Sequence, residues 1–226
     1  MRLAGRSFLL IAGVVLMISF LCAEAADAGV GLRIGARGIR MDPEGDDAED
    51  YSRPGWGGGL YALVVPENPL SLFAGIIGFD FVNLLDQTTE YIDQTTMLRI
   101  EQQTSQNYIR LYIGGRLGHQ GNGFFRPYAE ANIAMINYGI KTDVVIPDDV
   151  NPDNEIRQHL DDENRTVFGY DVTLGLELKA SRLFFVDIGA KYLKSFGVVQ
   201  QLSGDAVEVH PQYIMYFIGM NFRLDI

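Results

Sequence analysis

The chain has 226 residues with 18 Lys and Arg against 29 Asp and Glu, which gives a formal net charge of −11. This acidic balance and the absence of a basic stripe exclude nucleic acid as an expected partner. Later segments contain no long apolar run, so hydrophobicity must lie either in a soluble core or in alternating strands.

The first residues have the layout of a secretory signal peptide. Arg2 and Arg6 precede an apolar run of about fourteen residues, shorter than the roughly twenty that a spanning helix needs. Small residues follow the run, so we expect cleavage after Ala25 or Ala28. Residues 1–25 are therefore predicted to be a signal peptide, and residues 26–226 one barrel domain.

The chain has a single cysteine, Cys22, which falls inside this leader. Leu21 precedes it, whereas a lipoprotein processing site requires a small residue there. The mature chain then has no thiol for a disulfide, a metal site or a nucleophile, and we expect neither a cofactor nor a metal.

The mature chain contains eight predicted strands, of which six alternate with a period of two and two, 56–65 and 70–82, are less regular. In chain order they cover about 30–37, 56–65, 70–82, 108–117, 125–138, 166–179, 184–192 and 213–226. The alternation has no exception between Thr166 and Lys179. It also continues to the last residue of the segment from Tyr213 to Ile226.

The connections between these segments alternate in length. Short ones lie at 66–69, 118–123 and 180–182, and long polar ones at 41–54, 83–107, 141–165 and 195–211. This asymmetry predicts an all-β fold, an eight-stranded antiparallel transmembrane up-and-down barrel with short periplasmic turns and long extracellular loops.

Two features favour lipid on the apolar face. Aromatic residues such as Phe184 and Tyr192 lie toward the ends of the apolar faces, as at membrane interfaces. These two residues are about 27 Å apart along a strand, or about 20 Å in height after tilt, close to a barrel's apolar band. A soluble lipocalin-like barrel would invert the faces. The faces of the second and third strands stay open, because residues 56–82 are apolar on both parities in places.

With the apolar face outside, charged residues of both signs lie inside. The predicted interior polar network contains Arg33, Arg37, Arg110, Arg116, Glu130, Asp171, Glu177, Asp187, Lys191 and Arg223, with Lys179 and Asp225 on the same face. Isolated buried charges are very costly, so we expect these groups to be paired. An eight-stranded barrel has room for side chains only, which predicts a polar plug and no wide pore.

Several stretches carry a family resemblance: residues 126–131 (RPYAEA), residues 169–177, residues 187–192 (DIGAKY) and the last strand. The chain resembles the small outer-membrane β-barrels, including the membrane domain of outer membrane protein A and the opacity and outer membrane protein W types. The resemblance implies an outer-membrane location, with lipid and lipopolysaccharide around the wall. Gly219, Phe222 and Leu224 resemble the signal that the barrel-assembly machinery reads, although Asp225 and Ile226 follow where the family usually ends in Phe or Trp.

Other motifs give weaker signals. Of the three histidines, we place His119 in a turn and His159 in a loop, and only His210 lies near a strand end with Ser203, Asp205 and Glu208 close in sequence; we interpret it as a solvated loop residue and predict no catalytic residue. The acidic stretch 149–155 lacks the Gly and the final Glu of a calcium loop, so we interpret it as a solvated face. Glycines 57–59 after Trp56 favour a bulge or a close backbone approach over a ligand site.

The sequence therefore predicts a bacterial outer-membrane barrel with a structural or surface-interaction role and no catalysis. Two alternatives stay open. One is a narrow channel that passes small hydrophobic molecules through a lateral opening, as the resemblance to the outer membrane protein W type implies. The other is a lipid-modifying enzyme at the rim around His210.

Overall fold

The computed structural model describes residues 30–45, 48, 52–66, 72–92, 99–118, 123–146, 156–202 and 205–224. The predicted signal peptide and its cleavage sites lie outside these residues, so they stay predictions. In this part of the chain, no helix has the length and apolar character needed to span a membrane.

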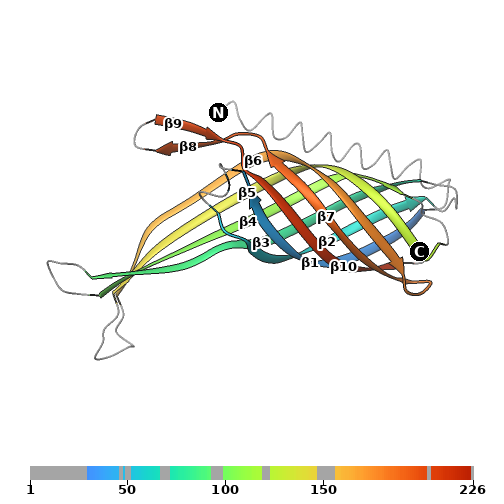
Figure 1. Ribbon diagram of the computed structural model, residues 1–226, viewed down its shortest axis with the longest axis horizontal. Coiled ribbons are helices and arrows are strands. Elements are labelled where there is room, and N and C mark those ends of the chain that lie inside the picture. Colours follow the sequence, from blue (N-terminus) through green and yellow to red (C-terminus); the bar gives the residue numbers. More distant parts are fainter. Residues whose placement is uncertain are drawn as a thin grey trace.

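Eight strands of the described chain close an antiparallel barrel, as predicted (Figure 1). They are β1 (Val30–Glu44), β2 (Gly55–Pro66), β3 (Phe73–Ile92), β4 (Arg99–Gly118), β5 (Phe125–Ile146), β6 (Ile156–Lys179), β7 (Phe184–Ser195) and β10 (Gln212–Leu224). Strands adjacent in this order pair with each other, and β1 pairs with β10 to close the wall. A separate hairpin of β8 (Val198–Leu202) and β9 (Asp205–Val209) lies in the link between β7 and β10.

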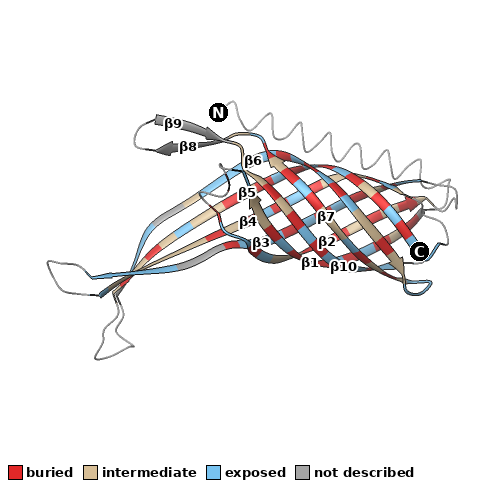
Figure 2. Ribbon diagram, in the orientation of Figure 1, coloured by how far each residue is buried: buried red, intermediate tan, exposed pale blue. Residues whose placement is uncertain are grey.

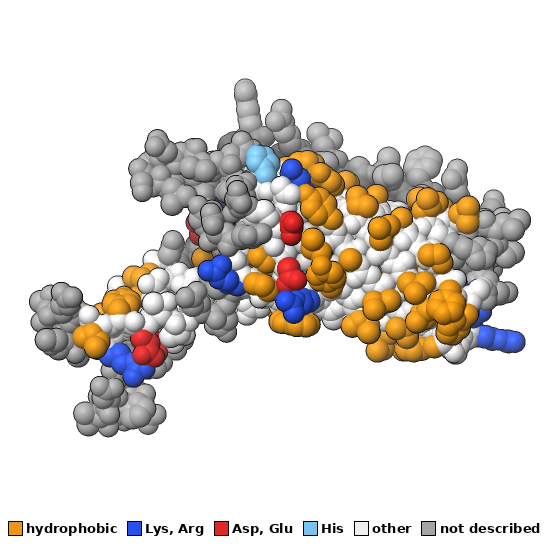
Figure 3. All heavy atoms as spheres, in the orientation of Figure 1, with side chains coloured by type: hydrophobic (Ala, Val, Ile, Leu, Met, Phe, Trp, Pro, Cys, Tyr) orange, Lys and Arg blue, Asp and Glu red, His pale blue; other side chains and the backbone are white. Residues whose placement is uncertain are grey.

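The two faces of the wall have opposite character, and burial alternates along each strand (Figure 2). Large apolar side chains point outward: Leu174 is 68% exposed and Ile133 is 63% exposed. Charged side chains point inward, and Arg110 is fully buried. Figure 3 shows hydrophobic side chains spread over the outside of the barrel. The arrangement is the inverse of that in a soluble domain.

The structure settles the faces of β2 and β3. On β2, Tyr61 and Leu63 are buried inside the barrel, whereas Leu60 is exposed outside. On β3, Ile76 points inward and Phe79 outward. Both strands thus place apolar side chains inside as well as outside. The sequence pattern there was ambiguous for this reason.

The predicted long loops 83–107 and 141–165 are wrong over most of their length, because β3 to β6 continue through them. These four strands have 20, 20, 22 and 24 residues, whereas the other four barrel strands have 15, 12, 12 and 13. Beyond Asn83 of β3 and Gly169 of β6, neither strand pairs with β2 or β7. The segments 85–92, 99–106, 139–146 and 156–168 form what we call the projecting sheet, a twisted extension on the left of Figure 1. Polar residues such as Thr88, Gln102 and Asn164 are frequent in this sheet and follow no period of two with the apolar ones, so alternation could not reveal it.

The outward apolar band has a sharp boundary where the projecting sheet begins. On β3 to β6 the last outward apolar residues are Phe81, Ile109, Met135 and Phe168. Two residues further along, on the same face, stand Asn83, Asn107, Asn137 and Thr166. The Asn137 amide donates a hydrogen bond to the Thr166 hydroxyl at 3.0 Å. Four adjacent strands therefore change from apolar to polar at neighbouring positions.

Candidate functional site in the barrel interior

The inside of the barrel contains a large set of buried ionisable side chains. They are Arg33, Arg37, Asp80, Arg110, Arg116, Arg126, Glu130, Asp171, Glu177, Asp187 and Lys191, each at most 5% exposed. All of them occupy the inward face of their strands. Their contacts divide them into two clusters along the barrel.

The lower cluster, nearer the short turns, is centred on Arg116. Its guanidinium donates to Glu130 at 2.7 Å, to Asp187 at 3.2 Å and to Glu177 at 3.3 Å. The Tyr128 hydroxyl also donates to Asp187, at 2.5 Å. The Arg116 guanidinium lies over the Tyr128 ring, with its central carbon 3.7 Å from the ring centre. One arginine thus joins carboxylates from three strands.

The upper cluster is built around two aspartates. Asp80 accepts hydrogen bonds from Arg37 at 3.0 Å and from Arg110 at 2.8 Å. Arg110 also pairs with Asp171, and the Lys191 ammonium lies 3.8 Å from that carboxylate. The pairing offsets the cost of burying each charge, but removing one partner would leave its neighbours buried and uncompensated.

Three tyrosines of these clusters lie over glycines of the neighbouring strand. The pairs are Tyr61 with Gly35, Tyr112 with Gly78 and Tyr128 with Gly175, each directly opposite in register. A Cβ atom on any of the three glycines would collide with the ring or hydroxyl of its tyrosine. These glycines therefore create the space that lets large side chains fold flat across the narrow interior.

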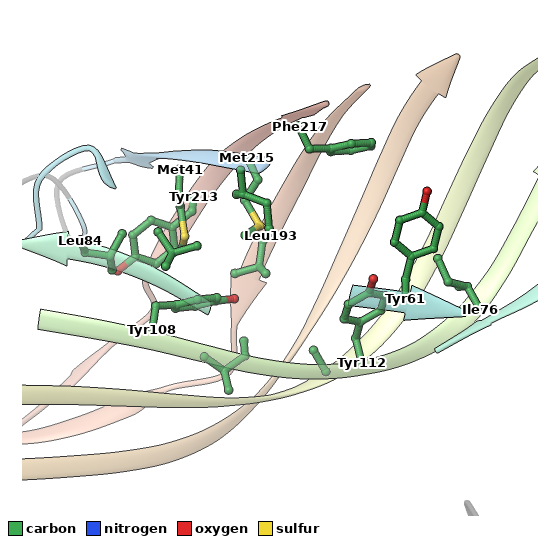
Figure 4. Close-up of a cluster of buried hydrophobic side chains, with 14 of the residues drawn as sticks. Met41, Tyr61, Ile76, Leu84, Tyr108, Tyr112, Leu193, Tyr213, Met215 and Phe217 are labelled. Atoms are coloured by element: carbon green, nitrogen blue, oxygen red, sulfur yellow. The ribbon is translucent and has the colours of Figure 1, made fainter. Parts of the chain in front are cut away.

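Above the upper cluster, uncharged side chains fill the barrel toward the projecting sheet (Figure 4). The labelled residues of this plug are Met41, Leu84, Tyr108, Leu193, Tyr213 and Met215, all at most 1% exposed. Tyr108 packs edge-to-face against Tyr138, with ring centres 5.4 Å apart. The Tyr138 hydroxyl is 2.7 Å from the Ser195 hydroxyl. The plug shields the ionic clusters from this end.

The link between β1 and β2 also contributes to the plug. The Ser52 hydroxyl hydrogen-bonds to the Gln106 amide oxygen at 3.3 Å and lies 3.2 Å from the Tyr213 hydroxyl. Ser52 is 3% exposed and Ala48 is 1% exposed. This link thus folds onto the plug.

Nine of the ten predicted network residues meet in these two clusters. The tenth, Arg223, is half-buried and lies directly opposite Arg33 in the β1–β10 pair. Lys179, on the same predicted face, is also half-buried, and Asp225 lies outside the described residues. Sequence reasoning missed Asp80 and Arg126. Arg126 shares the parity of Tyr128 and Glu130, so the pattern of β5 could have identified it. Asp80 lies on β3, whose parity was unsettled.

Two comparisons with known proteins gave no match: neither a protein-family model nor a curated protein matches the sequence. Solved structures do match. Neisserial surface protein A covers 87% of this chain and 99% of its own, with 10% identity and a TM-score of 0.55. A major outer membrane protein from Thermus thermophilus covers 87% and 100%, with 9% identity and a TM-score of 0.50. This chain has the fold of the small outer-membrane β-barrels. At 9% and 10% sequence identity, this similarity shows the fold alone.

The structure describes two of the three histidines, His159 and His210. His159 was predicted in a loop, but it lies on β6, with Nδ1 2.7 Å from a carboxylate oxygen of Asp143 on β5. The sequence around it is acidic on both faces, which conceals the strand. His119 and Ser203 lie outside the described residues, and His210 is half-buried.

The described residues contain no group of three or more His, Cys, Asp or Glu able to hold a metal, and the stretch 149–155 lies outside them. The glycines after Trp56 reflect close approach: a Cβ on Gly57 would meet the β3 backbone at Phe81, and one on Gly59 would meet the Asp80 carboxylate. Gly59 therefore makes room for the Asp80 side chain.

Proposed function

We propose that this chain is an outer-membrane β-barrel with a structural or surface-interaction role, a plugged interior and no catalysis. One observation carries the proposal: a closed wall with exposed apolar side chains outside and paired charges inside. Such a surface suits lipid, and closure leaves no unpaired strand edge within the hydrocarbon.

The exposed apolar band has the dimensions and the borders that a membrane requires. On β5 its outward apolar face runs from Phe125 to Met135, about 33 Å along the strand and about 25 Å in height after tilt. Aromatic residues lie toward both borders of the band: Phe73, Phe184 and Phe222 near the short turns, and Trp56, Tyr170 and Tyr192 near the projecting sheet. Such girdles are typical of the two membrane interfaces. This geometry supports outer-membrane placement, after export by the predicted signal peptide.

The filled interior argues against the channel alternative. Arg116 and Arg110 lie across the lumen in contact with carboxylates of several strands, and Met41, Tyr108 and Leu193 fill the space above them. An open path would need these side chains to separate, and the freed charges would then need new partners.

The projecting sheet suits water and supports the surface-interaction role. Its Arg99 pairs with Glu90 at 2.6 Å and with Glu101 at 3.1 Å, and all three are solvent-accessible. We propose that the short turns face the periplasm and that the sheet extends outside the cell. Outer-membrane lipid and lipopolysaccharide are the proposed surroundings. The barrel-assembly machinery is the proposed partner in biogenesis, through Gly219, Phe222 and Leu224.

Cysteine labelling tests the orientation, because the mature chain is predicted to contain no cysteine. We would introduce Thr88→Cys in the projecting sheet and Ser181→Cys in the β6–β7 turn, and express each in a diderm host. A membrane-impermeant maleimide should label intact cells carrying the first variant and label the second only after lysis. Labelling of both, or only of the second, in intact cells would contradict the proposed topology.

Planar-bilayer recording tests the plug. We would refold the chain in detergent, verify a heat-modifiable gel band and a β-type circular dichroism spectrum, and then insert it into the bilayer. We expect no sustained conductance steps. Regular steps would instead support the channel alternative, and a protein that stays soluble without detergent would contradict the membrane placement.

A further inference from the structure

Among the described residues, the interior at the short-turn end contains more cations than carboxylates. Arg33 and Arg126 donate to the same oxygen of Glu177, at 2.8 and 3.1 Å. Glu177 also accepts a hydrogen bond from Arg116, whose other two carboxylate partners are Glu130 and Asp187. One carboxylate therefore serves as the acidic partner of two arginines that are otherwise without one in the described structure.

Two more cations lie on the same inward face. Arg223 is directly opposite Arg33 in the β1–β10 pair, and Lys179 is directly opposite Phe185 in the β6–β7 pair. Both are half-buried, so they are nearer to solvent than Arg33 and Arg126. Arg223 therefore places a second guanidinium side chain next to Arg33 on the inward face.

The two buried guanidinium groups are held in fixed positions. The Arg33 and Arg126 guanidinium carbons lie 4.3 and 4.9 Å from the centre of the Phe185 ring. Arg126 also donates to the Gly123 carbonyl at 3.1 Å. Each guanidinium has five N–H donors, and within the described structure Arg33 uses one and Arg126 two. Fixed groups with spare donors lose little conformational freedom when they bind a ligand.

The two ends of the barrel also differ in exposed charge. At the short-turn rim, Arg182 is exposed, and no Asp or Glu is exposed among the described residues there. The projecting sheet instead exposes Glu90 beside Arg99. Figure 3 shows cationic side chains at the end of the molecule opposite the projecting sheet. The described residues of the short-turn mouth would therefore attract a soluble anion more strongly than those of the projecting sheet.

We propose that the short-turn mouth of the barrel binds a phosphate group, with Arg33 and Arg126 as the principal donors and Arg223 and Lys179 at the entrance. The four side chains come from four strands, β1, β5, β6 and β10, so donors approach from several directions. A tetrahedral phosphate accepts from more directions than a planar carboxylate, and guanidinium groups suit it well. This binding role goes beyond the proposed function, which assigns the interior no ligand.

Isothermal titration tests the proposal on the full mature chain in phosphatidylcholine vesicles. Inorganic phosphate is the probe, with chloride adjusted to keep the ionic strength constant. We expect saturable binding of one phosphate per chain, and at least tenfold weaker binding for Arg33→Gln and for Arg126→Gln. Arg126→Lys keeps the charge but loses the forked donor, so its affinity for phosphate should lie between those of the unmodified chain and of Arg126→Gln. The matched control is Arg40→Gln on the outer face, where Arg40 pairs with Asp42 and lies over Trp56; its binding should equal that of the unmodified chain.

A second measurement covers the case in which a variant does not fold. Phosphate should raise the thermal unfolding temperature of the unmodified chain more than chloride does at equal ionic strength. Replacing part of the phosphatidylcholine by phosphatidylglycerol, without free phosphate, distinguishes the source: an increase only there identifies a lipid headgroup as the phosphate donor. No increase in either experiment, or equal binding by Arg33→Gln and Arg40→Gln, would overturn the proposal.

Discussion

The closed barrel and the projecting sheet share four continuous strands, yet they differ in strand pairing and in the side chains that they expose. In the barrel, both edges of every strand are paired, apolar side chains face outward and Arg110 is fully buried inside. In the projecting sheet, the outer edges of β3 and β6 pair with no other described strand, polar side chains are frequent, and Arg99 on the same strand as Arg110 is about half exposed. The alternation in this sequence therefore reflects contact with lipid, whereas strand formation itself needs only hydrogen-bonding partners.

The largest effect in this comparison should come from two arginines of β4. Arg110→Met removes the shared partner of Asp80 and Asp171 and leaves buried charge uncompensated, so we expect a loss of about 3–5 kcal/mol in unfolding free energy. Arg99→Met removes solvent-accessible pairs with Glu90 and Glu101 and should cost below about 1 kcal/mol. Urea unfolding in vesicles, followed by gel mobility, measures both. Equal losses would mean that burial does not distinguish the two regions.

The next largest effect on stability should distinguish two positions on the outward face of β6, one inside the apolar band and one beyond it. Leu174→Arg places a charge near the middle of the apolar band, where it should destabilise the barrel by about 2–4 kcal/mol. Thr166→Arg, on the same face beyond the band, should cost below about 1 kcal/mol. The same unfolding assay, repeated in bilayers of different thickness, locates the boundary. A small loss for Leu174→Arg would contradict contact with lipid there.

Replacing a glycine in the barrel and one in the projecting sheet should give a smaller difference in stability. A Cβ at Gly175 would collide with the Tyr128 ring, so Gly175→Ala should cost about 1–3 kcal/mol through overpacking. At Gly139 in the projecting sheet a Cβ would meet only the end of the Asn164 side chain, which can move. Gly139→Ala should therefore change the stability by less than about 1 kcal/mol. If both variants unfold at the same urea concentration, the tyrosine packing is looser than described.

The smallest effect concerns pH and the projecting sheet. The hydrogen bond from His159 and the nearby Lys141 ammonium lower the pKa of Asp143 below its usual value. This pair therefore stabilises the folded sheet above the pKa of unfolded Asp, about 4, and the contribution is lost as pH falls through the lowered pKa. Carboxyl NMR titration should show a higher Asp143 pKa in His159→Gln. An unchanged pKa in that variant would contradict the pairing.

Much of the barrel could be predicted from its sequence because lipid imposes a simple rule. On β6, the residues from Phe168 to Leu178 alternate without exception, since the outward face must be apolar and the inward face must accommodate charge. Short turns could be located for the same reason. The rule stops at Thr166, where water surrounds both faces.

The remaining parts depend on contacts that no local pattern contains. The strand extension through Ile92 carries Gln, Thr and Glu on alternate positions of both faces, which resembles a loop in composition. Asp80 joins the network because Arg37 and Arg110 from other strands reach it, and the parity of β3 alone does not show this. The plug mixes Met, Leu and Tyr inside a barrel whose interior was expected to be polar.

Closure of the wall also determines when the interior can form. Arg33 and Glu177 are 144 positions apart in the chain, and Asn221 and Tyr61 are 160 apart. These bonds require β1 and β10 to meet, so the charges lose their water late and together. Long-range contacts of this kind slow folding because chain closure precedes the contacts that stabilise it. Assembly of this barrel should therefore proceed as one slow, cooperative step, with its ionic interior completed last.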